Sequence, residues 1–484
     1  GAGPNNTVVR YTRDGTFLLN DAGYLVTRNG LFVQGWGVDP FGSIIQNGLM
    51  PINIPLGTLS IAAASSTIAI GGNLNSSGIV ATQGSQHLSQ TLFLDAAMTQ
   101  PAVGNEDLTA TTLYVDDGTN TGVSIVAFDP ADLNRTITLS GVTKGGKPIP
   151  AQTFAISPTA VPGAAAFGVT LDDFCAFVEA ALGLDDTVVN GQSLGGDASI
   201  VNGQLVITGN EGTVQDLAID SSNITVNGAA AGLANPFELT KSQSADGESV
   251  RTSIVVYDAA GAPTLLDVTF VLEQRNPDDS TIWQVLVEDN DPSVYPRVIS
   301  VGSLTFDANG SLVSGGTLPV QVPDGTPPFD GPGQGITIDF GSALGPLRAL
   351  ATTSAVSTVA NDGAAPGTLS TFGIEADGRV MGGFTNGLTR VLGQLALARF
   401  ANNDGLVDAG DNQYGETDRS GAAVVGSGLT LGLGRVYGGA LEQANVELSQ
   451  EFIDMVQATT GFSAASRVVS TADELIRNLL ALGR

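Results

Sequence analysis

The alternation of hydrophobic and polar residues near both ends of the chain predicts antiparallel β-meanders. In residues 8–36, short apolar or β-branched runs are separated by turn dipeptides such as Asp14-Gly15. Residues 372–400 repeat this arrangement with the same kinds of dipeptide. Asp-Gly and Asn-Gly supply the positive φ that tight hairpin turns need. Two similar meanders at such distant positions predict that the ends of the chain meet in one β domain.

The middle of the chain predicts strands and one helix. Residues 250–257 and 265–272 alternate around a short turn, and apolar runs at 283–287 and 303–313 continue the pattern. Residues 171–182 instead carry apolar side chains at helical spacing. The apolar positions of this predicted helix are Leu171, Phe174, Cys175, Val178 and Leu182.

The C-terminal segment predicts a long helix with one apolar side. Residues 447–482 contain no Pro, and Gly461 is the only helix breaker among them. Large residues recur every seven positions and face small ones over about five heptads, which favours a coiled coil with close helix approach. The predicted interface residues are Leu448, Phe452, Met455, Ala458, Phe462, Ala465, Val469, Ala472, Ile476 and Leu479. Such a helix needs a partner, because packing supplies most helical stability. We expect that partner to be a missing N-terminal helix, neighbouring copies of the chain, or both.

These patterns predict a mainly β, multidomain fold. We expect nested β domains, a long C-terminal coiled-coil-type helix, and one small inserted domain of α+β or β class. The expected parts are an inner β domain from residues 1–80 and 345–446, a middle β domain from 81–105 and 233–344, an inserted outer domain at 106–232 with its helix near 171–182, and a C-terminal core helix at 447–484.

Charge and composition exclude several partners. The 484 residues include 19 Lys and Arg against 48 Asp and Glu, giving a net charge of −29. Nucleic-acid binding needs clustered basic residues, and an anionic membrane surface would repel this chain. Hydrophobic residues make up 42% of the chain, which is too many for wholesale disorder. No apolar run reaches the roughly 20 residues of a membrane-spanning helix, so we expect no membrane insertion.

The single Cys and the single His leave little room for catalysis. Cys175 has no intrachain disulfide partner and is most simply a small buried hydrophobe. His87 cannot supply the several imidazoles of a zinc enzyme, and it is the only candidate base for a Ser-His-Asp triad. We therefore predict no catalytic residues, no cofactor and no metal ligands.

Three motifs admit a chemical interpretation, and each has a structural alternative. Residues 191–195 match G-x-S-x-G, but no helix follows and His87 lies upstream, so a Gly-rich turn is favoured. Residues 141–147 match the phosphate-binding G-x-x-x-x-G-K, but Pro148 replaces the Ser or Thr, which favours a hairpin turn. Residues 402–416 are rich in side-chain oxygens without the spacing of a calcium loop. Solvated turns are the default there, and a bound calcium ion stays an alternative.

Several stretches resemble one known family. Residues 11–36 are similar to the Y-T-R-D-G-x-F meander of the bacterial flagellar hook and rod proteins, and residues 393–406 resemble a later strand and turn. Residues 427–482 resemble the family's C-terminal signature, although Thr459-Thr460-Gly461 stands where a Gln-Arg type pair is usual. The family begins with a long N-terminal helix, and we expect this chain to start beyond it.

The resemblance implies a structural subunit of the flagellar hook. Such subunits self-assemble into a curved, flexible tube, a universal joint that transmits torque from rod to filament. The implied partners are further copies of the chain, the rod, the hook cap, the hook–filament junction proteins and the type III export apparatus. The implied location is the extracellular flagellum, reached without a cleaved signal peptide.

Two other functions stay open at this point. Rod proteins share the terminal motifs, so another axial protein, such as a distal rod subunit, is the alternative, although the length and the large insertion favour the hook. A secreted β-rich adhesin or calcium-dependent hydrolase is the third hypothesis. It draws on the acidic balance and on residues 106–232, which match nothing in the family.

Overall fold

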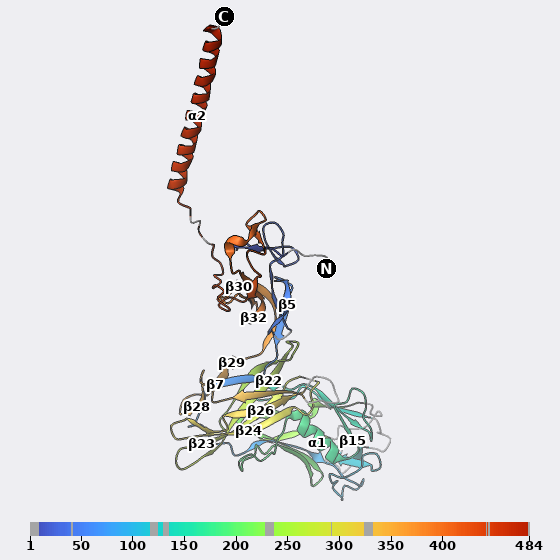
Figure 1. Ribbon diagram of the computed structural model, residues 1–484. Helices are drawn as coiled ribbons and strands as arrows, with labels where there is room; N and C mark the ends of the chain where they lie inside the picture. The colour runs from blue at the N-terminus through green and yellow to red at the C-terminus, as the bar shows by residue number, and fades with distance from the viewer. Residues whose placement is uncertain are drawn as a thin grey trace. The chain divides into compact units, whose positions relative to one another are not determined.

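A computed structural model gives the fold (Figure 1). It describes residues 9–39, 42–116, 124–128, 135–227, 237–291, 293–323, 333–441, 443 and 446–482. Two compact units are present: residues 1–58, 369–383 and 389–484 form unit 1, and residues 59–368 with 384–388 form unit 2. Strands dominate, and the described residues hold two α-helices, α1 (Leu171–Leu182) and α2 (Leu448–Leu482). The predicted mainly β class is confirmed.

One sheet joins strands from the two ends of the chain. Its six members are β5 (Ile44–Pro51), β4 (Gln34–Val38), β32 (Thr389–Leu395), β31 (Arg379–Phe384), β30 (Ala364–Ile374) and β6 (Ser60–Ala63), in that spatial order. The pairing of β4 with β32 is antiparallel and connects the N-terminal strands to the C-terminal meander. This pairing confirms that the chain ends meet in one β domain.

Apart from α2, the remaining elements of unit 1 are short. They are β1 (Tyr11–Thr12), β2 (Leu18–Leu19), β3 (Leu25–Val26), β33 (Leu397–Arg399), a 3-10 turn η4 (Asn403–Gly405), β34 (Val407–Asp408), β35 (Gln413–Gly415) and β36 (Val424–Gly426).

One predicted hairpin in the N-terminal meander is wrong. β1 pairs with β35 rather than with β2, so no hairpin forms across Asp14-Gly15. Gly15 has no positive φ, whereas Gly23 and Gly30 both have φ of 79°. The physical reason is an Asx turn, in which the Asp14 carboxylate accepts a hydrogen bond from the backbone N–H of Thr16 at 2.9 Å. This side-chain bond turns the backbone without the left-handed conformation of a hairpin.

Two sheets of unit 2 share one hydrophobic core. The first sheet is a meander of β21 (Ser249–Tyr257), β22 (Pro263–Arg275), β23 (Thr281–Asp289), β24 (Val298–Phe306) and β25 (Leu312–Ser314). The second sheet is built around β7 (Thr67–Asn75), with β26 (Thr317–Val322), β27 (Gln334–Asp339), β28 (Leu347–Leu350) and β29 (Ala355–Asn361). Phe270 of the first sheet and Phe340, which follows β27, meet edge to face at 5.7 Å. The two sheets therefore pack face to face.

A second hydrophobic core lies within residues 92–239, which we call the insert region. The strands that flank it are β8 (Gly84–Thr91) and β20 (Thr240–Gln243). The elements between them are β9 (Leu113–Asp116), β10 (Ser124–Phe128), β11 (Thr136–Leu139), β12 (Thr143–Lys144), β13 (Lys147–Pro148), β14 (Gln152–Ile156), β15 (Ala166–Gly168), α1, β16 (Asp197–Val201), β17 (Gln204–Glu211), η2 (Thr213–Gln215), β18 (Leu217–Ala218), η3 (Ser221–Asn223) and β19 (Ile224–Asn227). The division of unit 2 into a middle and an outer domain stays a prediction.

The predicted helix at 171–182 is confirmed, and both of its ends are capped. Thr170 and Asp173 form a capping box, in which the Thr170 hydroxyl accepts from the Asp173 N–H and the Asp173 carboxylate accepts from the Thr170 N–H. Gly183 ends the helix in the left-handed conformation, with φ of 63°. The apolar side of α1 faces the insert core, where Phe174 and Phe177 are fully buried.

Candidate assembly surface on the C-terminal helix

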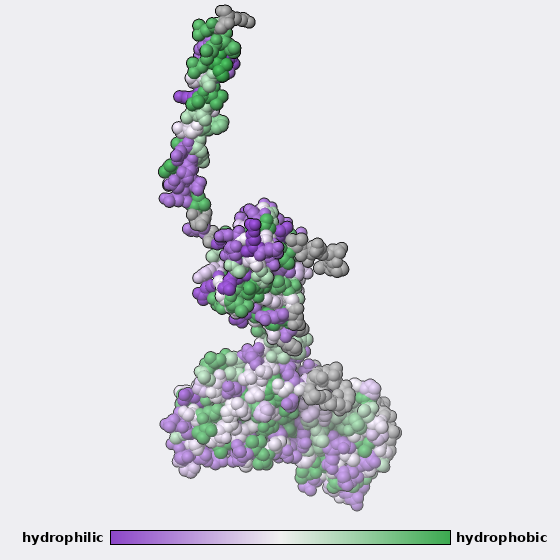
Figure 2. Space-filling model, in the orientation of Figure 1, coloured by the Kyte–Doolittle hydropathy of each residue, from purple (hydrophilic) through white to green (hydrophobic). Residues whose placement is uncertain are grey.

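α2 is a long helix with no buried side. It runs for 35 residues without Pro, which corresponds to about 50 Å at 1.5 Å per residue. Each residue from Leu448 to Leu482 is exposed in the single chain. Figure 2 shows hydrophobic residues along the visible side of this helix, most densely in its C-terminal half. A helix in water gains little from propensity alone, so α2 lacks the packing that normally stabilises a helix of this composition.

All ten predicted interface residues lie on α2. The seven large ones, Leu448, Phe452, Met455, Phe462, Val469, Ile476 and Leu479, are 57–77% exposed. Their spacing of three, four and seven residues places them along one side of the helix. Ala458, Ala465 and Ala472 alternate with them and would let a neighbouring helix approach closely. Whether these residues form an interface stays a prediction.

The sequence interpretation missed part of the apolar surface. Val468, Leu475 and Leu482 are also spaced by seven residues and are 69%, 58% and 85% exposed. They occupy a row next to the predicted stripe in the C-terminal half. On the other flank of the stripe, Phe452 and Leu480 take equivalent positions four heptads apart. The apolar surface is therefore wider than the predicted stripe, and the second seven-residue repeat is the signal that could have revealed this.

Gly461 lies near the middle of α2. The helix continues through Thr459, Thr460 and Gly461 without interruption. A Cβ added at Gly461 would meet nothing within 4 Å, and the position opens onto a shallow hollow beside Phe452, Ile453 and Val456. Gly costs roughly 1 kcal/mol relative to Ala in a helix interior, so its presence favours a close contact at this point over intrinsic helix stability.

Polar contacts within α2 contribute little to its stability. Arg477 pairs with Asp473 at 3.1 Å, but the two side chains are 78% and 61% exposed. Gln450 donates a hydrogen bond to Asp454 at 3.2 Å, also on the surface. Exposed pairs of this kind are worth less than about 1 kcal/mol each.

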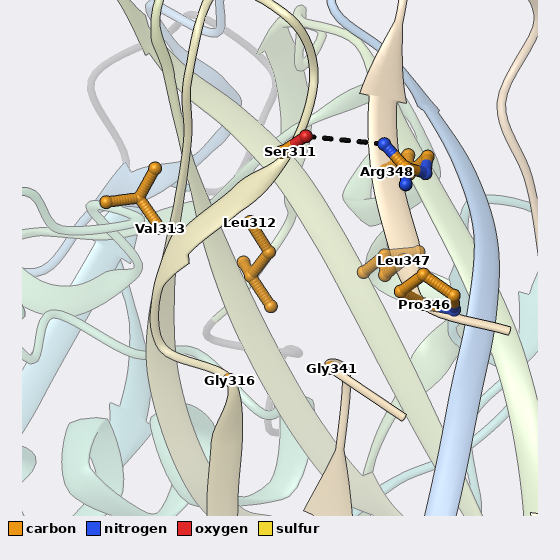
Figure 3. Close-up of a pocket in the computed structure, with 8 residues that line it drawn as sticks. All are labelled: Ser311, Leu312, Val313, Gly316, Gly341, Pro346, Leu347 and Arg348. Carbon is orange, nitrogen blue, oxygen red and sulfur yellow. Dashed lines mark hydrogen bonds between the residues drawn. The ribbon is translucent and has the colours of Figure 1, made fainter. Parts of the chain in front are cut away.

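A small pocket in unit 2 lacks the groups that catalysis uses. It has a volume of about 320 Å³ and lies between β25 and β28. Figure 3 shows its lining, in which Arg348 donates to the Ser311 hydroxyl at 3.3 Å. The other lining residues are Leu312, Val313, Gly316, Gly341, Pro346 and Leu347. These side chains offer neither a general base nor an activated nucleophile.

The sequence motifs with a chemical interpretation have structural roles. Lys144 ends β12 and Lys147 begins the paired strand β13. The turn residues between them, Gly145 and Gly146, have φ of 58° and 79°, so the hairpin interpretation is confirmed. Ser193 lies in a turn between Gly191 and Gly195, which have φ of 81° and 68°, and β16 follows rather than a helix. The Gly-rich turn is therefore confirmed.

Cys175 and His87 are both buried. The Cys175 side chain packs in the insert core, and burial raises the pKa of its thiol to about 12, so it is confirmed as a small hydrophobe. His87 lies on β8, and burial lowers the pKa of its imidazole to about 4. Within the described ranges, no group of three or more His, Cys, Asp or Glu side chains is placed to hold a metal ion. No helix among the described residues has the length and apolarity needed to span a membrane.

Three family models match separate parts of the chain. Residues 2–90 match the flagellar hook protein FlgE/F/G D1 domain, residues 218–364 match the flagellar basal body protein FlaE D2 domain, and residues 437–482 match the flagellar basal body rod FlgEFG protein C-terminal model. The chain belongs to the flagellar rod and hook protein family. The matched segments leave out residues 91–217, which hold most of the insert region.

Curated relatives of this family are hook proteins. The flagellar hook protein FlgE of Caulobacter vibrioides is 27% identical over 533 aligned residues, which cover 98% of this chain and 82% of the relative. The flagellar hook protein FlgE of Salmonella typhimurium is 32% identical over 239 residues, or 49% of this chain. The chain spans 57% of the length of that relative.

A solved structure of a hook protein aligns weakly with this chain. The crystal structure of Helicobacter pylori flagellar hook protein FlgE2 is 20% identical and covers 86% of this chain and 88% of that chain, with a TM-score of 0.38. The similarity is too low for a comparison of the two folds.

Proposed function

We propose that this chain is a structural subunit of the bacterial flagellar hook, the curved and flexible tube that transmits torque from rod to filament. The observation that carries the proposal is α2, whose large apolar residues are all exposed in the single chain. Burying a Leu or Phe side chain is worth roughly 1.5–3 kcal/mol, so several such residues give a strong drive to associate. Association with further copies of the chain would bury these residues, and the same contact would repeat along a polymer.

Helical assembly follows from a contact between unlike surfaces. A head-to-tail contact that does not close into a ring generates an open helical polymer. In this polymer, the helices of residues 447–484 pack as the inner core. The inner β domain of residues 1–80 and 345–446, the middle domain of 81–105 and 233–344, and the outer domain of 106–232 lie at increasing radius. Bending requires that the outer contacts slide while the core helices stay packed.

The proposed partners follow from that position. They are further copies of the chain, the rod, the hook cap, the hook–filament junction proteins and the type III export apparatus that delivers the unfolded chain. Export in an unfolded state suits a protein with a single Cys and hence no intrachain disulfide. The proposed location is the extracellular hook, attached to the basal body.

A distal rod subunit is the second candidate. Two of the matched models span rod and hook proteins alike, because they describe the D1 domain and the C-terminal part of FlgE, FlgF and FlgG together. The hook is favoured since the curated relatives named above are hook proteins. The two candidates differ in position, as rod lies inside the cell envelope and hook outside it. An adhesin or hydrolase role has no supporting contact or cluster among the described residues.

Deletion of the gene, followed by electron microscopy of isolated flagella, tests the proposal. We expect basal bodies that carry a rod and no hook. A wild-type copy of the full natural gene should restore hooks, and a copy that lacks residues 448–482 should not. Antibody labelling of the restored structures should mark the segment outside the envelope.

Two results would contradict the hook assignment. Intact hooks in the deletion strain would show that another protein builds them. Labels confined to the segment inside the envelope would assign the chain to the rod instead. Complementation by the copy without residues 448–482 would remove the proposed role of α2 while leaving the hook assignment in place.

A further inference from the structure

The only histidine of the chain is buried against the core of the insert region. His87 lies on β8, which runs between β17 and β20 in a four-stranded sheet. Ile207 of β17 and Lys241 of β20 are its partners in register. Residues directly opposite each other in an antiparallel pair point to the same face, so the imidazole shares a face with the core residue Ile207. The His87 side chain is 0% exposed.

The buried side of β8 carries three polar side chains, and the middle one is unsatisfied. The Ser85 hydroxyl accepts a hydrogen bond from the Leu217 N–H at 3.1 Å, and the Ser89 hydroxyl accepts one from the Leu205 N–H at 2.8 Å. His87 lies between these serines, and neither Nδ1 nor Nε2 has a hydrogen-bond partner among the described residues. Leu205 and Leu217 are fully buried members of the insert core. The imidazole therefore lies in apolar surroundings.

The charged groups near His87 are already engaged with each other. The Lys241 ammonium on β20 pairs with the Asp216 carboxylate at 2.7 Å. The neighbours of His87 on β17, residues 206–208, carry no ionisable side chain. β9 also approaches β8, and its ionisable residues are Tyr114 and Asp116. A protonated His87 would therefore compete with Lys241 for the Asp216 carboxylate.

These surroundings hold the imidazole in its neutral form. Burial, and then the charge of Lys241, lower the pKa of His87 to about 4, while the Asp216 carboxylate acts in the opposite direction. A neutral imidazole without partners loses its hydrogen bonds to water on burial. A charged imidazole loses in addition the hydration of a full charge, which is far more costly.

We propose that His87 makes the fold of unit 2 sensitive to acid, because the core of the insert region accommodates its imidazole only in the neutral form. At neutral pH the side chain packs as a core residue. Acid favours those locally unfolded forms in which the imidazole reaches water and takes up a proton. Local unfolding of β8 and its neighbouring strands is sufficient for this, and no movement of one rigid part against another is required. The property belongs to the single chain and does not rest on the proposed function.

The sign of the pH dependence follows from linkage. The pKa of the imidazole is about 4 in the folded chain and near 6.5 in an unfolded one. Between these values the unfolded form binds more protons, so the contribution of His87 to stability falls as the pH falls through this window. Burial raises the pKa values of Glu211 and Glu273, and their contributions have the opposite sign. The effect of His87 is therefore measured as a difference from a variant without the imidazole.

Nuclear magnetic resonance of the unmodified chain gives the first test. Because the 484 residues include a single histidine, a ¹³C label at its Cε1 atom gives one signal that belongs to His87. We expect this signal to keep its neutral-form position between about pH 7.5 and pH 5, as long as circular dichroism shows a folded chain. A titration of the folded chain with a midpoint near the ordinary value of about 6.5 overturns the proposal.

Hydrogen exchange gives the second test. Amides of β8, β17 and β20 are followed by mass spectrometry in the unmodified chain and in His87→Leu, and corrected for the intrinsic pH dependence of exchange. We expect the opening constant of the unmodified chain, divided by that of the variant, to rise by up to about tenfold per pH unit below about pH 6.5, because opening takes up one proton. The same pH dependence in both chains overturns the proposal.

A positional control separates burial from the mere presence of histidine. In the His87→Leu background, Gln86→His moves the imidazole to the other side of β8, where residue 86 is half-buried. This double variant should titrate near the ordinary pKa and exchange with the pH dependence of His87→Leu. The pH dependence of the unmodified chain in this double variant would refute the role of burial.

A second substitution covers the case in which His87→Leu does not fold. His87→Gln also removes the ionisable group, retains a polar side chain, and should show the same loss of pH dependence. The resonance measurement needs no substitution and decides the question by itself. None of these results affects the hook assignment, because the free chain is measured.

Discussion

The two α-helices of this chain obtain their stability from different sources. α1 has 12 residues, seven of which are buried, and both of its ends are capped. α2 has 35 residues, none of which is buried in the single chain. Short helices are marginal in water without tertiary contacts, and so are longer ones of ordinary composition. α1 therefore folds with its own domain, whereas α2 has no comparable packing among the described residues.

The difference shows how burial separates a folding element from an assembly element. Both helices carry large apolar residues at intervals of three and four. In α1 these residues face strands of the same chain, while in α2 they face solvent. Periodicity alone predicts a helix in both cases, and the presence or absence of an intrachain partner decides its role. Mutations that affect α2 should thus act on assembly, and mutations that affect α1 should act on folding.

The largest expected effect is that of Phe462→Asp on assembly. Phe462 is 77% exposed in the single chain and lies in the middle of the apolar stripe. A carboxylate placed in a buried helix seam is strongly unfavourable. Cells that carry this variant of the full gene should form no hooks by electron microscopy, although the variant chain should fold as well as the wild type by circular dichroism.

Asn478→Asp is the matched control for this change. It adds the same charge to α2 at a position outside the predicted interface, where the seven-residue repeat carries polar residues. Hooks of normal number and length are expected from this variant. Normal hooks from Phe462→Asp would contradict the assignment of the stripe, and missing hooks from both variants would point to a general intolerance of charge.

Phe174→Ala should have the largest effect on folding. Phe174 is fully buried in α1, stacked on Phe237 at 4.8 Å and edge to face with Phe154 at 5.6 Å. Removal of a buried Phe side chain costs about 3–5 kcal/mol. Native-state hydrogen exchange of α1 should be accelerated accordingly. Phe462→Ala should leave the exchange of α1 unchanged, and equal effects of the two variants would erase the contrast between the helices.

Lys144→Met tests how the C-terminus of α1 is satisfied. α1 has no basic residue in its last turn, and Lys144 instead donates to the Gly183 carbonyl and to Glu288, both at 2.9 Å. Burial lowers the pKa of Lys144, and the Glu288 carboxylate opposes that shift. Removing the lysine leaves a buried carboxylate unpaired, which costs about 3 kcal/mol or more. The loss is expected as faster hydrogen exchange at the end of α1.

Lys241→Met is the control for this buried pair. Its partner is Asp216, and both side chains are 32% exposed. Solvent screens such a pair, so the expected loss is below about 1 kcal/mol. Similar losses in both variants would mean that burial of the Lys144 pair does not matter to the stability of α1.

The sequence predicted the elements of this fold better than its contacts. The spacing of Leu171, Phe174 and Val178 was sufficient for α1, because a helix is defined by local periodicity. The hairpin expected across Asp14-Gly15 was wrong, since an Asx hydrogen bond competes with the left-handed turn and leaves no trace in the dipeptide itself. Pairing between distant segments was predicted only for residues 8–36 and 372–400, because these two meanders resemble each other in sequence.

The candidate sites were predictable to different degrees. The apolar stripe on α2 was visible as a seven-residue repeat, whereas the wider apolar surface needed a second repeat through Val468 and Leu475 to be noticed. The contacts of Lys144 with Glu288 and of Gln284 with the Gln192 carbonyl could not be predicted, because they join segments whose packing depends on the whole of unit 2. Gln284 and Glu288 are 0% and 3% exposed, and no sequence pattern indicated that this side of β23 is buried.

The smallest expected effect is that of Thr170→Ala at the N-terminus of α1. The Thr170 hydroxyl accepts a hydrogen bond from the Asp173 N–H at 3.1 Å, and its loss leaves that donor without a partner. Loss of such a cap costs about 1 kcal/mol. Exchange of the first-turn amides should rise by about fivefold, and Thr170→Ser should retain most of the protection, because serine provides the same acceptor. An unchanged first turn in Thr170→Ala would mean that tertiary packing alone holds α1, which would sharpen its contrast with α2, none of whose residues 448–482 is buried in the single chain.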